Sequence, residues 1–111
     1  MLLIIRSRAT PKQMEQMLET LGIYIKLAVD IQRGILAGGG ELHADCEQVL
    51  LEDGSEQANI WGADWNPRKQ KVGYESLINI RPRAGNRSME IQDPAIREQV
   101  THIVQRLLGN L

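Results

Sequence analysis

Alternating apolar and polar residues predict several short strands in this chain. Residues 2–6 form an apolar run that ends at a charged residue, which is typical of a short buried strand. Residues 23–31 alternate throughout, so they are predicted to form a strand with one apolar face and one polar face. Residues 32–34 read as a tight turn with glycine in its last position, and the chain is then expected to return as a strand over residues 35–37.

Two segments carry both the start and the stop signals of a helix. The first begins with a capping box at residues 10–13 and ends at Gly22. The second begins at Asp93, which is followed by proline, and ends before Gly109. Both carry an apolar stripe at helical spacing, made of Met14, Met17, Leu18 and Leu21 in the first segment and of Ile96, Val100, Ile103, Val104, Leu107 and Leu108 in the second.

Residues 41–53 fit two patterns. Polar and apolar residues alternate over the first half of this segment, as they would in a strand. The same segment has an apolar stripe at helical spacing, and it is rich in Glu and Leu with a single β-branched residue. We interpret it as a helix that ends at Gly54, with a strand as the alternative.

The remaining segments complete an α+β domain that spans residues 1–111. Strands are predicted at residues 59–65 and 72–81, and a polar loop at residues 82–92 precedes the last helix. The predicted fold is an antiparallel sheet with helices mainly on one face. Its first six elements match a ferredoxin-like β-α-β-β-α-β core, to which a further strand and a C-terminal helix are added. Many unrelated functions share that fold, so it identifies none of them.

Composition narrows the class of protein. The chain has 111 residues, of which 42% are hydrophobic, so one domain with a packed core is expected. A domain of this size buries a modest share of its surface, and we expect it to gain stability as a homodimer. The single cysteine, Cys46, has no partner for a disulfide within the chain, and no apolar run approaches a signal peptide or the roughly 20 residues of a membrane helix. We therefore expect a cytoplasmic protein with no membrane association and no cofactor.

Charge is unevenly distributed although the net charge is only -1. Six acidic residues and no Lys or Arg lie between Glu41 and Glu56, whereas six basic residues and one acid lie between Asn66 and Arg87. The small net charge makes nucleic acid an improbable partner for the whole molecule. The simplest interpretation is that the two regions complement each other within one molecule or across a dimer.

Several blocks of sequence resemble a known family. They are residues 35–47, 50–55, 61–65, 76–83 and 86–91, which together span nearly the whole chain. These blocks are similar to those of a family of small, uncharacterised bacterial and archaeal proteins, a domain of unknown function. The resemblance implies a stand-alone domain, and it provides no catalytic residue that can be carried over to this sequence.

The strongest candidate for a binding site is a group of basic and amide side chains near the predicted end of the 72–81 strand. Guanidinium groups bind carboxylate or phosphate through paired hydrogen bonds, so a cluster of arginines can hold an anion. The alternative is that the arginines form salt bridges with the acidic 41–56 segment. The candidate ligand-binding residues are His43, Asp45, Arg81, Arg83, Asn86 and Arg87.

A metal site is a weaker hypothesis. Metal-capable side chains occur at Glu41, His43, Asp45 and Glu47, but on a helix they divide between two faces. A zinc site normally needs three or four ligands, and only two converge on each face. We therefore predict no bound metal.

Three classes of function remain open at this point. The first is a binding or interaction module that recognises a small anion or a protein partner. The second is a small metal-dependent or acid–base enzyme built from Glu41, His43, Asp45 and the arginines. The third is a nucleic-acid binder in which Trp61 and Trp65 stack on bases beside Arg68, Lys69 and Lys71, although two Trp in a chain without Phe are expected to fill the core.

Overall fold

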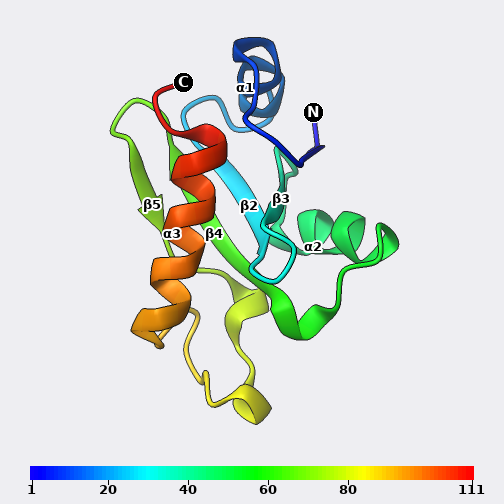
Figure 1. Cartoon of the computed structure of the whole chain (residues 1–111), viewed down its shortest axis with the longest axis vertical. Coiled ribbons are helices and arrows are strands. Elements are labelled where there is room, and N and C mark those ends of the chain that lie inside the picture. Colours follow the sequence, from blue (N-terminus) through cyan, green and yellow to red (C-terminus); the bar gives the residue numbers. More distant parts are fainter.

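The computed structural model describes residues 1–111, which form one antiparallel sheet with helices on both of its faces (Figure 1). The five strands lie in the order β1-β3-β2-β4-β5, and every neighbouring pair is antiparallel. The strands are β1 (Leu3–Ile5), β2 (Ile25–Asp30), β3 (Ile35–Gly38), β4 (Ile60–Asn66) and β5 (Lys71–Gly73). The helices are α1 (Pro11–Leu18), α2 (His43–Glu52) and α3 (Pro94–Leu108), with short 3-10 turns at Gln57–Asn59, Leu77–Asn79 and Pro82–Ala84.

The predicted α+β class is confirmed, but the ferredoxin-like arrangement is not. Strand β3 lies between β1 and β2, which makes β1 and β2 parallel to each other, as in a split β-α-β unit. Strand β4 then pairs with β2 on the far side from β1. Both helical crossovers therefore move in the same direction across the sheet, although they start from antiparallel strands. Because such crossovers are right-handed, α1 and α2 are placed on opposite faces.

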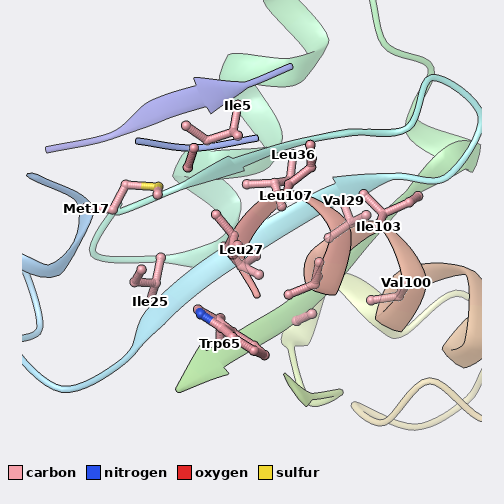
Figure 2. Packing of buried hydrophobic residues seen from close by; sticks show 14 of the residues in the cluster. Ile5, Met17, Ile25, Leu27, Val29, Leu36, Trp65, Val100, Ile103 and Leu107 are labelled. Atoms are coloured by element: carbon pink, nitrogen blue, oxygen red, sulfur yellow. The ribbon is translucent and has the colours of Figure 1, made fainter. Parts of the chain in front are cut away.

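The two faces carry separate apolar cores. On one face, residues of α1 and α3 pack against β2, and Figure 2 shows Leu27 and Val29 of β2 near Leu107 and Ile103 of α3. On the other face, α2 packs on the sheet through a smaller cluster of six buried residues. Two of the three helices, α1 and α3, therefore lie on one face, in agreement with the expected sheet with helices mainly on one face. The placement of α2 on the other face follows from the position of β4.

The helix predictions are confirmed, including the ambiguous segment at residues 41–53. In α1 the hydroxyl of Thr10 accepts a hydrogen bond from the Gln13 backbone, and the Gln13 side chain accepts one from the Thr10 backbone, which completes the capping box. Helix α3 is capped by Asp93. Helix α2 starts at His43 without a side-chain cap. None of the helices is both long and apolar enough to cross a membrane.

The predicted strand at residues 72–81 is correct only for its first part. The chain leaves the sheet after Gly73, and it forms a 3-10 turn at Leu77–Asn79 instead of continuing beside β4. The side chain of Asn79, fully buried, takes the place of the missing strand. Its Oδ1 accepts a hydrogen bond from the Gly62 backbone N–H at 2.8 Å, and its Nδ2 donates to the Gly62 carbonyl at 3.0 Å.

Gly62 is required at this close approach. A Cβ atom at this position would lie 2.4 Å from the Cβ of Ser76, a separation that real side chains do not adopt. The absence of a side chain on β4 thus allows the segment after β5 to lie directly on the sheet. This contact forms one wall of the cleft described next.

Candidate functional site

A polar pair lies at one end of the sheet face that α2 covers. Lys26 of β2 and Asp64 of β4 are direct cross-strand partners, and they follow the small residues Ala28 and Gly62 along the same two strands. Successive side chains of a strand point to opposite faces of the sheet, so residues two positions apart share a face. These four positions therefore all lie on the face beneath α2. The small residues leave room for the helix, whose first residue, His43, lies against the polar pair.

His43 is held by two acceptors. Its Nε2 lies 3.0 Å from the carbonyl oxygen of Ala63 and 3.0 Å from Oδ1 of Asp64, and the side chain is 13% exposed. Because both neighbours accept hydrogen bonds, Nε2 carries the hydrogen. None of the hydrogen bonds of the chain involves Nδ1, so this nitrogen is free to accept one from another molecule. A carboxylate that orients a histidine in this way is a common feature of acid–base sites.

A cleft of about 360 Å³ opens beside this histidine. Its walls come from the start of α2, from the C-terminal half of β4 and from the loop after β5. Asn79 anchors this loop to Gly62 of β4. The polar residues of the cleft are Lys26, His43, Asp64, Glu75 and Ser76, and its apolar residues are Leu42, Ala44, Leu77, Ile78 and Met89.

The apolar rim of the cleft is unusually exposed. Leu42, Leu77 and Met89 are 57%, 72% and 41% exposed, and they are three of the six large apolar side chains that the whole molecule leaves exposed. Single exposed apolar residues are ordinary on a protein surface, whereas a group of them around a hollow marks a site of interaction. Two exposed acidic residues, Glu41 and Asp45, lie on the same segment of chain as Leu42.

Arg81, the central residue of the predicted anion site, is already engaged. Its Nε donates to the Ile78 carbonyl, and its two terminal nitrogens donate to the Gln57 carbonyl and to the carboxylate of Glu47. The guanidinium group also lies over the ring of Trp61 at 4.9 Å. Burial lowers the pKa of Arg81, and the charge of Glu47 partly offsets this effect. Arg81 therefore joins the acidic segment to the loop, as the salt-bridge alternative expected.

The other predicted site residues are dispersed. Arg83 lines a separate hollow of about 370 Å³ with Arg81, and Arg87 is exposed on the following loop. Asn86 is buried, and its amide donates to the carbonyls of Asn79, Ser88 and Glu90, so it organises the loop. Asp45 is exposed on α2. Of the six candidates, only His43 lines the cleft.

The four weak metal candidates do not come together either. His43 turns toward Asp64, and Glu47 pairs with Arg81 at 3.3 Å, so these two side chains diverge. Glu41 and Asp45 are exposed. Nowhere in the chain do three or more His, Cys, Asp or Glu side chains lie together in a way that could hold a metal ion.

Comparison with known proteins places the chain in a family. A family model described as "Protein of unknown function (DUF5674)" matches residues 3–107. The chain belongs to this family. No curated protein and no solved structure is similar to it by the same comparisons. The family match covers the helix α2, the cleft and the loop that anchors it, and it adds no functional residue.

Sequence reasoning missed three residues of the cleft, which are Lys26, Asp64 and Glu75. Lys26 was assigned to the polar face of its strand, and Asp64 is the one charged residue in the strand predicted at 59–65. A charged residue inside an otherwise apolar strand indicates a candidate site residue, and Asp64 could have been found in this way. The sequence did not reveal that these two positions are opposite each other, because their register depends on pairing between distant strands.

Proposed function

We propose that the chain is a binding module that recognises a basic, partly apolar segment of a protein partner in the cleft between α2 and the loop after β5. The observation that carries this proposal is the gathering of exposed Leu42, Leu77 and Met89 around a cleft that Asp64 and Glu75 also line. An arginine or lysine of a partner would lay its aliphatic stem on the rim and direct its charge toward the carboxylates. The unpaired, buried Cys46 supports the reducing cytoplasm as the compartment.

Electrostatics favour a basic partner over an anion. Asp64 and Glu75 line the cleft, and Glu41 and Asp45 are exposed on the chain segment that contains Leu42, whereas Lys26 is the only lysine or arginine that lines the cleft. The ammonium group of Lys26 already donates a hydrogen bond to the Glu41 carbonyl. The guanidinium group of Arg81 is engaged elsewhere. A protein partner is therefore the better supported of the two kinds of ligand expected from the sequence.

The test is a titration with a fluorescent peptide of arginine, leucine, glycine and serine, followed by anisotropy. Saturable binding is expected, and Leu77→Asn should weaken it about tenfold, since burial of one leucine contributes about 1.5 kcal/mol or more. The control is Ile80→Asn, because Ile80 is also a large exposed apolar residue, at 45%, and does not line the cleft. A peptide with glutamate in place of arginine should not bind. Equal affinities of the Leu77 and Ile80 variants would refute the proposal.

A small acid–base enzyme is the second candidate, and the free Nδ1 of His43 beside Asp64 supports it. Hydrolysis of p-nitrophenyl acetate is a simple reporter of a reactive histidine. On this reading His43→Gln would lose the activity, whereas His102→Gln, which changes the exposed histidine of α3, would retain it. Equal rates for the two variants would remove the enzymatic candidate.

A further inference from the structure

A second hollow lies at the turn between β4 and β5. This turn is at one end of the sheet (Figure 1). The hollow has a volume of about 490 Å³ and is formed by the turn after β4 and by the connection between α1 and β2. Leu18 and Pro67 line it together with Ile23, which is 73% exposed and is the most exposed large apolar residue of the chain. We call this region, with Arg68, Lys69 and Lys71, the basic tip.

The cations of the basic tip are free. Arg68, Lys69 and Lys71 are exposed, and none of the ion pairs of the molecule includes them. Their turn is nevertheless fixed, because Oδ1 of Asn66 accepts a hydrogen bond from the Lys69 backbone. The tip therefore presents cations beside an exposed aliphatic side chain, on a backbone that is already ordered.

The basic tip has the chemistry that the cleft is proposed to bind. The cleft offers an apolar rim with surrounding carboxylates, and the tip offers Ile23 with surrounding cations. Between them, the two regions contain four of the six large apolar side chains that the molecule leaves exposed. Complementary charge of this kind guides association and sets register.

The edges of the two regions meet on β4. Asp64 of the cleft and Asn66 of the tip are two residues apart on β4, a separation of roughly 7 Å at about 3.3 Å per residue. Adjacent complementary patches suit a two-fold axis that passes between them. In such a pair each region of one molecule meets the other region of its partner, and the contact is made twice.

We propose that the occupant of the cleft is the basic tip of a second copy of the chain, in a two-fold symmetric homodimer. This inference rests on the proposed function, because it uses the same cleft as the recognition surface. Each cleft receives Ile23 and the neighbouring cations of the other molecule. A different protein partner must then compete with the second copy for the cleft, so self-pairing regulates access to it.

The test exchanges the charges of the two surfaces. One variant carries Asp45→Lys and Glu75→Lys beside and in the cleft, and the other carries Arg68→Glu and Lys69→Glu at the tip. All four residues are exposed and unpaired, so the fold is retained. Each variant alone brings like charges together in both contacts, and its dimer should dissociate at least about tenfold more readily. An equimolar mixture brings opposite charges together in both contacts, so it should form heterodimers.

Sedimentation velocity measures the oligomeric state. The wild type and the mixture should be dimeric, and each variant alone should be monomeric. The control variant, Arg83→Glu with Arg87→Glu, makes the same charge change on another loop and should stay dimeric. A monomeric wild type, a mixture that stays monomeric, or a control that dissociates like the tip variant would overturn the inference. Ile23→Asn should also be monomeric while it still binds the arginine–leucine peptide. Peptide binding that depends on Leu77 in a monomeric wild type would leave the proposed function standing and remove the self-pairing alone.

Discussion

Asn79 is predicted to be the residue on which the loop of the cleft depends most. It is fully buried, and its Oδ1 accepts a hydrogen bond from the Gly62 N–H, while its Nδ2 lies within hydrogen-bond distance of the carbonyls of Gly62, Tyr74 and Met89. Asn79→Ala leaves a buried N–H without a partner, at a cost of about 1–3 kcal/mol, and it removes the donor that three carbonyls share. We expect a total loss of about 3 kcal/mol in the free energy of unfolding.

Urea unfolding followed by circular dichroism measures this loss. For a chain of this length it corresponds to a fall of about 12 °C in Tm, at about 4 °C per kcal/mol. Asn66→Ala is the matched control, because its side chain accepts a single hydrogen bond in an exposed turn, and it should cost about 1 kcal/mol or less. Asn79→Asp should be at least as harmful as Asn79→Ala, since its carboxylate would face three carbonyl oxygens. A loss no greater than that of the control would refute this account of the loop.

Three further predictions concern stability and reactivity. Arg6 and Arg33 lower the pKa of Asp53 to about 2, so their ion pairs stabilise the fold above the ordinary carboxyl pKa of 3.8, and this contribution disappears as the pH falls through about 2. Asp53→Asn should therefore lower Tm at neutral pH, and a difference that persists unchanged below pH 2 would contradict this. Gly62→Ala should cost about 2 kcal/mol or more, because its Cβ would overlap the loop after β5, and urea unfolding that shows no loss would argue against the close contact. Burial raises the pKa of Cys46 to about 11, so its thiol should react with Ellman's reagent at pH 8 only after unfolding, and rapid labelling of the folded chain would show that this packing is wrong.

The sequence predicted the helices well because their signals are local. The capping box at residues 10–13, the proline after Asp93 and the spacing of apolar residues are all contained within the segment that they describe. For residues 41–53 the composition decided correctly between helix and strand. The burial of Trp61 and Trp65 was also expected from their size and from the absence of Phe.

The errors arise where distant segments meet. The alternation over residues 72–81 resembles a strand, yet the buried amide of Asn79 replaces the backbone there, and no local pattern indicates such a substitution. The position of β4 beside β2, which sends α2 to the second face, depends on the order of strands in the sheet and not on their periodicity.

The candidate site was predicted only in part, because it too depends on contacts between segments that are distant in the sequence. His43 was identified by its chemistry, whereas its partner Asp64 is set by the pairing of β2 with β4 and by the place where α2 begins. For Arg81, the contact with Glu47 was the alternative that the structure bears out.

The central claim is that recognition takes place in the cleft beside His43, and the amide chemical shifts of the folded chain test it most directly. On titration with the arginine–leucine peptide, we expect the largest changes in ¹H–¹⁵N spectra at residues 42–44, 63–64 and 75–78. The shifts of Arg81, Arg83 and the exposed face of α3 should stay unchanged. Changes centred on those arginines or on α3, with the cleft residues unaffected, would contradict the account.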